Sequence, residues 1–248
     1  MKCLILCAGY ATRLYPLTLD MPKPLMPIAG KPILEHILKK IEELDAIDEI
    51  FIVTNSKFFD NFRNWKRGYS GAKPIKILND RTKTEYDRLG AIGDIDFALK
   101  EEKISGEIMV VAGDNLFDFS LRHLHGFFRE KTASVIALYD IRQKSLAAGK
   151  YGIVEVDESG KVIGFEEKPE SPKTTLVSTA CYIFSETDIK ELERCIAENN
   201  KPDNLGDFIN WISKRKPIYG YAFSGRWFDI GNKEQLMEAD KEWSRKII

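Results

Sequence analysis

The first loop of this chain holds its most informative chemistry, and it follows an apolar strand expected at residues 2–7. Gly9 lets a ligand approach the backbone closely because glycine has no Cβ. Arg13 and Lys23 add a planar guanidinium fork and a point charge, ten residues apart on a loop that also contains three prolines. Backbone N–H groups, a fork and an ammonium are what a polyphosphate needs. The segment therefore predicts a phosphate-binding loop, whereas two solvated cations on an ordinary turn are the simpler alternative.

Two aspartates far apart in the sequence follow predicted strand ends. Asp114 comes after the apolar run at 108–112 and a glycine, and Asp229 lies between a strand and the last helix. Because ligands of open α/β sheets bind outside the carboxyl ends of the strands, we expect Asp114 at the same edge as Gly9. Mg²⁺ takes such carboxylate oxygens and shares them with substrate phosphates. An Asx turn at Asp114 and a helix N-terminal charge at Asp229 are the alternatives.

Strands and helices alternate along the first half of the chain. Continuous apolar runs predict strands at 2–7, 49–54, 75–78, 107–112 and 133–139, and helical spacing predicts helices at 33–44, 57–67, 90–100 and 121–130. The second half predicts a hairpin at 152–156 and 161–166, strands at 176–184 and 217–223, and helices at 186–198, 205–213 and 233–246. This order predicts a doubly wound α/β fold with a mostly parallel (mixed) sheet covered on both faces.

The order of residues in the first loop resembles the signature of sugar-1-phosphate nucleotidyltransferases, of which glucose-1-phosphate thymidylyltransferases are the best-known members. The matching segments are Ala-Gly-Tyr-Ala-Thr-Arg-Leu-Tyr-Pro-Leu-Thr, Pro-Lys-Pro-Leu-Met-Pro-Ile and Gly-Lys-Pro-Ile-Leu. The resemblance implies a Rossmann-like fold, Mg²⁺ as cofactor, and transfer of a nucleotidyl group from dTTP or UTP to a sugar 1-phosphate. Tyr10 and Ala11 depart from the family, which more often has glycines or small residues there. An αL backbone at Ala11 would cost more than at glycine.

The resemblance also implies roles for individual residues. Arg13 and Lys23 would be catalytic, and Asp114 and Asp229 would hold the metal. The nucleotide would be bound by Ala8, Gly9, Tyr10, Ala11, Thr12, Asn79, Leu89 and Gly90. The sugar phosphate would be bound by Gly152, Glu166, Lys168 and Thr179, with Glu166 on a sugar hydroxyl and Lys168 on the phosphate. The alternative for Glu166 and Lys168 is an ordinary surface ion pair. The alternative for the polar segment 79–93 is a mobile surface loop.

No boundary rich in Gly, Ser or Pro divides the chain, and it contains no internal repeat. Residues 1–248 are therefore expected to form one nucleotidyltransferase domain, with a nucleotide-binding core at 1–140 and a sugar-phosphate-binding half at 141–248. Two other functions stay open. One is a cytidylyl- or uridylyltransferase that acts on a non-sugar phosphate such as phosphocholine, and the other is a degenerate nucleotide-binding regulatory module. The sequence Gly9-Tyr10-Ala11 breaks the dinucleotide-binding fingerprint, which argues against an oxidoreductase.

Composition limits the partners. With 37 basic and 38 acidic residues the formal net charge is −1, so no global field recruits nucleic acid or an anionic membrane. No apolar run reaches the roughly eighteen residues of a membrane-spanning helix, and the chain starts as a strand rather than as a signal peptide. Its four cysteines form no close metal-type pair. We therefore expect a cytoplasmic protein without nucleic-acid or membrane partners. The resemblance implies an NTP and a sugar 1-phosphate as its partners and allows a homo-oligomer.

Overall fold

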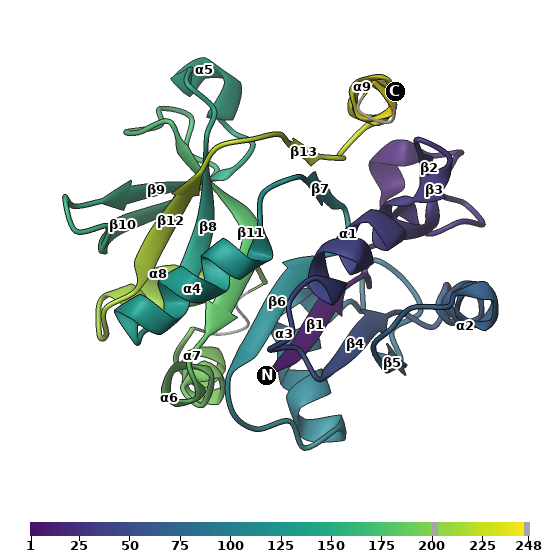
Figure 1. The fold of residues 1–248 in the computed structure, drawn as a ribbon, viewed down its shortest axis with the longest axis horizontal. Coiled ribbons are helices and arrows are strands. Elements are labelled where there is room, and N and C mark those ends of the chain that lie inside the picture. Colours follow the sequence, from purple (N-terminus) through teal and green to yellow (C-terminus); the bar gives the residue numbers. More distant parts are fainter. Residues whose placement is uncertain (200–202, 246–248) are drawn as a thin grey trace.

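The computed structural model describes residues 1–199 and 203–245, and it shows strands at the centre with helices around them (Figure 1). The nine strands of the main sheet are β1 (Lys2–Leu6), β4 (Glu49–Thr54), β5 (Ile75–Asn79), β6 (Ile108–Ala112), β8 (Val135–Asp140), β9 (Gly152–Val156), β10 (Val162–Glu167), β11 (Leu176–Phe184) and β12 (Tyr219–Phe223). Along one path they follow the order β10-β9-β11-β6-β1-β4-β5, while β8 pairs with both β11 and β12.

The sheet changes character between its two halves. Strand β1 runs parallel to its neighbours β4 and β6, and β5 continues this parallel half beside β4. Strand β11 then joins β6, β8 and β9 in antiparallel pairs. The predicted doubly wound α/β fold with a mixed sheet is therefore confirmed. Its parallel half brings the carboxyl ends of β1, β4, β5 and β6 to one edge, where side chains from all of them can meet.

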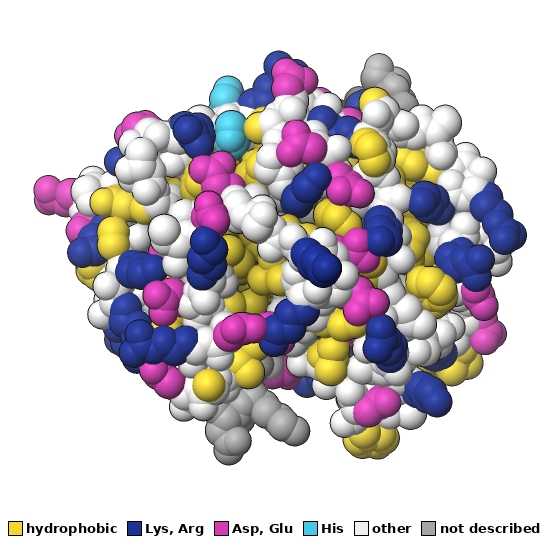
Figure 2. All heavy atoms as spheres, turned by 90° about the horizontal axis from the view of Figure 1, so that it is seen from below, with side chains coloured by type: hydrophobic (Ala, Val, Ile, Leu, Met, Phe, Trp, Pro, Cys, Tyr) yellow, Lys and Arg dark blue, Asp and Glu magenta, His cyan; other side chains and the backbone are white. Residues whose placement is uncertain are grey.

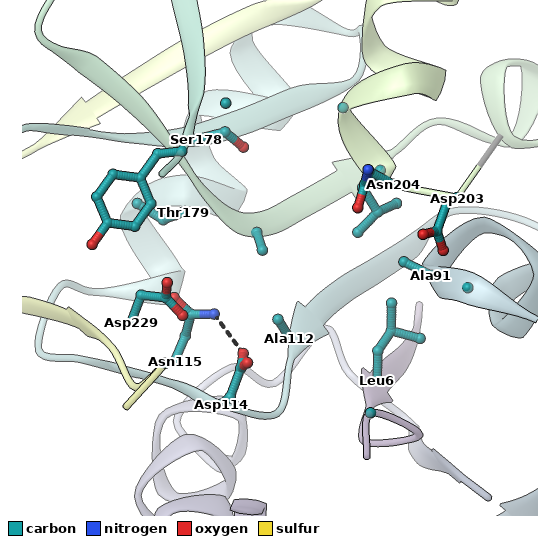
Figure 3. A pocket seen from close by; sticks show the side chains of 18 of the residues that line it. Leu6, Ala91, Ala112, Asp114, Asn115, Ser178, Thr179, Asp203, Asn204 and Asp229 are labelled. Carbon is teal, nitrogen blue, oxygen red and sulfur yellow. Dashed lines mark hydrogen bonds between the residues drawn. The ribbon is translucent and has the colours of Figure 1, made fainter. Parts of the chain in front are cut away.

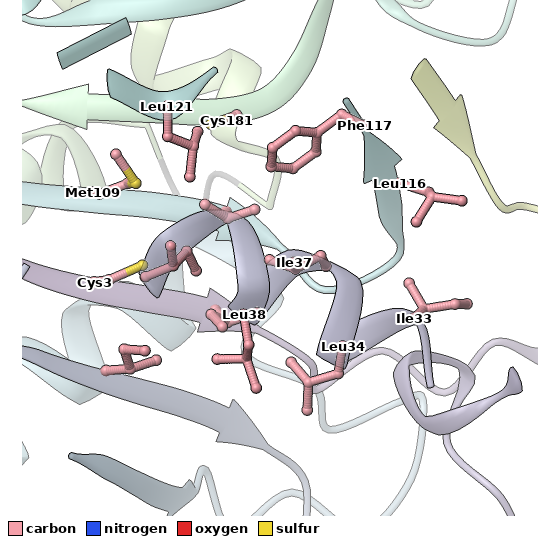
Figure 4. Close-up of a cluster of buried hydrophobic side chains, with 14 of the residues drawn as sticks. Cys3, Ile33, Leu34, Ile37, Leu38, Met109, Leu116, Phe117, Leu121 and Cys181 are labelled. Atoms are coloured by element: carbon pink, nitrogen blue, oxygen red, sulfur yellow. The ribbon is translucent and has the colours of Figure 1, made fainter. Parts of the chain in front are cut away.

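Helices cover both faces of the sheet. They are α1 (Ile33–Glu42), α2 (Phe59–Gly68), α3 (Gly90–Glu101), α4 (Leu121–Lys131), α5 (Lys144–Ala147), α6 (Glu186–Ile189), α7 (Leu192–Glu198), α8 (Leu205–Ser213) and α9 (Lys233–Ser244). Successive residues of a strand point to opposite faces. Accordingly Cys3 packs with α1 and α4 in one buried cluster (Figure 4), and Leu4 packs with α3, α7 and α8 in another. Continuous apolar strands follow from this double burial.

The predicted elements at 49–54, 152–156, 176–184 and 205–213 are confirmed with the same bounds. The helix predicted at 186–198 is instead two helices, α6 and α7. The last helix is described as far as Ser244, and residue 246 of its predicted range lies outside the described residues. Two short ribbons were not predicted, β2 (Pro27–Ile28) with β3 (Lys31–Pro32) and β7 (Asn115–Phe117) with β13 (Trp227–Asp229). Strands of two or three residues are too short to show a period in the sequence.

The surface and the described helices agree with the composition. Figure 2 shows basic and acidic side chains interspersed over one face rather than gathered by sign. All four cysteines are buried and unpaired. Within residues 1–199 and 203–245, no helix has the length and apolar character needed to cross a membrane.

Candidate active site

A cavity of about 810 Å³ lies along the carboxyl edge of the sheet. Its floor includes Leu6 and Ala112, the last residues of β1 and β6. Figure 3 shows Asp114, Asn115 and Asp229 on one side of this cavity, with Ala91, Asp203 and Asn204 on another. Of the site residues expected from the sequence, eleven line the cavity: Ala8, Gly9, Arg13, Lys23, Leu89, Gly90, Asp114, Gly152, Lys168, Thr179 and Asp229.

The ribbon of β7 and β13 brings the two candidate metal ligands together. In its register Asp229 lies opposite Asn115, the residue that follows Asp114. The Asn115 amide is fixed because its Oδ1 accepts from Trp227 Nε1 at 2.6 Å while its Nδ2 donates to Asp114 Oδ1 at 3.0 Å. Burial, and then the negative charge of Asp114, raise the pKa of Asp229 to about 6. Two neighbouring carboxyls of this kind can hold a cation between them.

Three cations line the same part of the cavity. Lys23 begins the short 3₁₀ helix Lys23–Leu25, and its Nζ lies 2.5 Å from Asp114 Oδ2 and 2.7 Å from the Ile230 carbonyl oxygen. Arg13 lies in the 3₁₀ helix Thr12–Leu14. Arg13, Lys23 and Lys168 all lower the pKa of Asp229, which places their charges near that carboxyl. The arrangement can therefore hold a polyphosphate between cations on one side and a metal held by carboxylates on the other.

Four residues expected at the nucleotide do not line the cavity: Tyr10, Ala11, Thr12 and Asn79. The Tyr10 ring is buried, and its hydroxyl lies 3.1 Å from Thr82 Oγ1. Ala11 adopts the αL conformation, with φ 50° and ψ 42°, and its carbonyl accepts from the Thr18 hydroxyl at 2.8 Å. Asn79 Oδ1 accepts from the Ser56 hydroxyl and from the Arg81 N–H, so its amide supports the backbone turn.

Glu166, which was expected at the substrate, does not line the cavity, and its neighbour Glu167 does. Glu167 lines the cavity, whereas Glu166 pairs with Lys173 at 2.6 Å outside it. The strand register shifts between Val162 and Gly164, and Val162 and Phe165 are both buried in the same cluster although they lie three residues apart. This bulge adds one residue to the strand and reverses the alternation of faces after it. Glu167, which follows Phe165 by two, therefore points to the cavity side.

The residues around Glu167 fit a close-packed ligand pocket. A Cβ on Gly152 would lie 2.5 Å from Phe165 Cζ and 3.2 Å from Glu167 Oε2, so only glycine fits there. Burial raises the pKa of Glu167. The Thr179 hydroxyl donates to the Ala137 carbonyl at 2.9 Å, which leaves its oxygen lone pairs for a further donor.

Sequence reasoning missed several residues of the cavity wall. Asp80 and Asp94 are buried acids at one end, and Lys150, Tyr151, Asn204 and Gln235 lie elsewhere along it. A signal for Asp94 was available, because it is a charged residue at helical spacing from Ala91 and Ala98 in helix α3. Such a position favours either a paired or a functional carboxyl.

Known proteins resemble this chain along its whole length. A family model described as "Nucleotidyl transferase" matches residues 2–246. The bifunctional protein GlmU of Methanocaldococcus jannaschii is 31% identical over 250 residues, which cover 100% of this chain and 55% of that protein. GlmU of Methanococcus aeolicus is 30% identical with the same coverage. The chain thus spans about half the length of the curated relatives it matches.

Solved structures share the fold. A crystal structure of apo UDP-glucose pyrophosphorylase has a TM-score of 0.82 at 21% identity, covering 100% of this chain and 99% of that one. A putative glucose-1-phosphate thymidylyltransferase from Bacillus anthracis, in complex with a sucrose, has a TM-score of 0.80 at 22% identity and covers 100% and 96% of the two chains. At such identities the likeness concerns the fold alone.

Proposed function

This chain belongs to the nucleotidyl transferase family, and we propose that it transfers a nucleotidyl group from an NTP to a sugar 1-phosphate with release of pyrophosphate. One observation carries the proposal. Asp114 and Asp229, which are remote in sequence, meet in one cavity with Arg13, Lys23 and Lys168. The family match supports nucleotidyl transfer, and the resemblance of the first loop to sugar-1-phosphate nucleotidyltransferases supports the class of acceptor.

In the proposed reaction an oxygen of the sugar phosphate attacks the α-phosphorus of the NTP. A new P–O bond forms, the bond between the α-phosphorus and the bridging oxygen breaks, and pyrophosphate leaves with the electron pair. The attacking phosphate is already an anion at neutral pH, so no general base is required. Catalysis then consists of positioning the two substrates and neutralising the charge that spreads in the transition state.

Each cation of the cavity has a place in this scheme. Arg13 would stabilise the leaving pyrophosphate, because its fork can hold two oxygens at once. Lys23 would neutralise the α-phosphate region and Lys168 would bring in the acceptor phosphate. Glu167, in place of the expected Glu166, would accept a hydrogen bond from a sugar hydroxyl, since it lines the cavity beside Gly152.

Asp114 and Asp229 fit a bound Mg²⁺. Both offer carboxylate oxygens to the cavity, and Asp114 raises the pKa of Asp229, so a cation near both relieves their repulsion. No cluster of three or more His, Cys, Asp or Glu side chains suited to a metal occurs among the described residues. Oxygens of water and substrate would therefore complete the coordination, as is usual for this ion. When bound, Mg²⁺ would supply positive charge to the α-phosphate oxygens.

The base of the NTP is the finer part of the proposal. The resemblance favours dTTP or UTP, and Leu89 and Gly90, which carry that expectation, do line the cavity. The same wall also carries Asp80 and Asp94, whose carboxyl oxygens are not matched to the carbonyl edges of uracil and thymine.

Pyrophosphate release tests the function directly. The purified chain is incubated with Mg²⁺, each of CTP, GTP, ATP, UTP and dTTP, and the 1-phosphates of glucose, galactose, mannose and N-acetylglucosamine. We expect release that requires both substrates and yields the matching NDP-sugar. Phosphocholine serves as the comparison acceptor. Release with phosphocholine in place of every sugar 1-phosphate, or with none of the acceptors, would overturn the proposal.

A further inference from the structure

Two buried carboxyls face one end of the cavity. Asp80 follows the last residue of β5, and Asp94 lies one turn into α3, on the face that also presents Gly90 to the cavity. Their exposed fractions are only 5% and 6%. Buried aspartates are rare unless they are paired or used, and the mechanism above uses neither of them.

Asp80 is held rigidly from the protein side. Its Oδ1 accepts from the Thr82 N–H and from the Thr82 hydroxyl, each at 2.8 Å. The single hydroxyl hydrogen of Thr82 is thereby used, so the Tyr10 hydroxyl must donate in the 3.1 Å contact with Thr82 Oγ1. Tyr10, the family departure beside the phosphate loop, thus positions the Thr82–Asp80 pair.

The Asp94 carboxyl has fewer hydrogen-bond partners than that of Asp80. Its Oδ1 is buried, and no donor from the described residues reaches it. The two side chains are joined by a hydrogen bond, so a proton lies between the Asp94 and Asp80 carboxyls. Burial, followed by the charge of Asp80 and a hydrogen bond with it, raises the pKa of Asp94 to about 8. At neutral pH the pair is therefore one acid beside one carboxylate. Because its single proton lies between the two carboxyls, the oxygens left for a ligand are acceptors.

The pair lies at the end of the cavity that the nucleoside would occupy, an argument that rests on the proposed function. In the sheet, β5 is separated from β1 by β4, while β6, β11 and β9 lie on the other side of β1. Arg13 and Lys23 follow β1, and Gly152, Lys168 and Thr179 come from the β9, β10 and β11 side. With phosphates between these groups, the β5–α3 end with Gly90, Asp80 and Asp94 is left for the base.

We propose that Asp80 and Asp94 select a nucleotide base that carries an exocyclic amino group and reject uracil and thymine. Cytosine and adenine each carry an amino group at the edge of the base, and its N–H groups can donate to the acceptor oxygens of the pair. Guanine presents two adjacent N–H donors that one carboxylate accepts together. Uracil and thymine place a carbonyl oxygen on each side of one N–H, so acceptor would face acceptor. A site built to make hydrogen bonds rejects an analogue that leaves its polar groups unpaired.

Equilibrium binding tests the proposal without depending on catalysis. Calorimetric titration of the whole chain at pH 7 with Mg²⁺ and CTP, GTP, ATP, UTP or dTTP, without acceptor, gives five dissociation constants. We expect at least one amino-bearing nucleotide to bind about tenfold or more tightly than both UTP and dTTP. Equal or tighter binding of UTP or dTTP overturns the inference, and so does failure of all five to bind.

The variant Asp94→Asn keeps the shape of the side chain, but its amide has two N–H hydrogens. One can replace the shared proton, and the other adds a donor that a carbonyl oxygen of uracil or thymine can accept. We expect the preference for the amino-bearing base over UTP to fall by about tenfold. Asp96→Asn is the matched control, because Asp96 lies on the same helix, pairs with Lys100 and does not line the cavity. An unchanged preference in Asp94→Asn, or an equal change in Asp96→Asn, contradicts the assignment.

Two further comparisons distinguish base selection from ribose binding and from nucleotidyl transfer itself. Binding of deoxyribose forms of the preferred nucleotide tests whether the carboxyls hold ribose hydroxyls instead. A large loss with the deoxy form and no discrimination between bases overturns base selection. Base-selective binding together with no pyrophosphate release from any acceptor would leave base selection standing and reject the proposed function. Transfer to a sugar 1-phosphate with UTP or dTTP preferred would do the reverse.

Discussion

Asp229 lies directly opposite Asn115 in the ribbon formed by β7 and β13, and this pairing places its carboxyl beside that of Asp114. The ribbon is held by Trp227 Nε1, which donates to Asn115 Oδ1 at 2.6 Å. The consequence is electrostatic. Burial and the neighbouring Asp114 raise the pKa of Asp229, whereas Lys23, Arg13 and Lys168 oppose that rise. A three-residue strand therefore assembles the part of the cavity on which the proposed chemistry depends.

Asp114 and Asp229 should behave as one metal site, so that losing either carboxylate has the same effect. Asp114→Asn and Asp229→Asn are each expected to remove Mg²⁺-dependent pyrophosphate release while the fold is retained. Because either change dismantles the same site, the double variant should be little worse than each single one. Turnover measured over a range of Mg²⁺ concentrations, with circular dichroism for the fold, provides the test. Losses that simply add in the double variant would show that the two residues do not share a metal.

Arg13→Ala should lower turnover by about 10²–10³-fold, the scale for losing one preorganised electrostatic stabiliser. Arg13→Lys should recover only part of this loss, because an ammonium cannot replace the fork. Arg63→Ala is a suitable control, since Arg63 is exposed on α2 and does not line the cavity. Steady-state rates of pyrophosphate release decide the matter, and a normal rate for Arg13→Ala would remove the assignment.

Lys168 should serve the acceptor and not the NTP. Lys168→Ala is expected to raise the KM for the sugar 1-phosphate while the NTP affinity stays nearly constant. Lys173→Ala is the matched control, because Lys173 pairs with Glu155 and Glu166 and does not line the cavity. Acceptor KM values and calorimetric NTP titrations supply the two readouts. Lost NTP affinity with an unchanged acceptor KM would contradict the role.

Glu166 and Glu167 are adjacent, but only Glu167 lines the cavity, so the same substitution at each position tests which one contacts the substrate. Glu167→Gln should impair use of the sugar 1-phosphate by about tenfold or more, because a hydrogen-bonding group that lines the substrate cavity is altered. Glu166→Gln should leave that use nearly unchanged, since Glu166 binds Lys173 outside the cavity. Measuring kcat/KM for the acceptor in both variants tests the one-residue correction directly. The opposite ranking would restore the expectation drawn from the sequence.

Stability should depend on pH through Asp94. Its pKa is raised to about 8 in the folded chain, so the folded state keeps a proton that the unfolded state loses above about pH 4. The unfolded state then binds fewer protons, and the free energy of unfolding falls as the pH rises from about 4 to about 8. Asp94→Asn cannot ionise, so its gain in Tm over the unmodified chain should grow across this range. Thermal melts at several pH values check the slope, and a constant difference would contradict it.

Much of the frame could be predicted from the sequence because its signals are local. Continuous apolar runs identified β4 and β11, and helical spacing identified α8, since burial on both sheet faces and on one helix face follows from short-range periodicity. The loop chemistry of Gly9, Arg13 and Lys23 was readable for the same reason, and all three residues line the cavity.

Only the tertiary structure decided how the ends of these elements meet. The bulge between Val162 and Gly164 turned Glu167 inward in place of Glu166, because one extra residue reverses a strand's alternation. The ribbon that joins Asn115 to Asp229 is too short to leave a period and depends on a long-range pairing. The role proposed for Asp80 and Asp94 depends on the burial of both side chains next to each other by β5 and α3. The pKa and the partners of a carboxyl depend on surroundings that its neighbours in sequence do not specify.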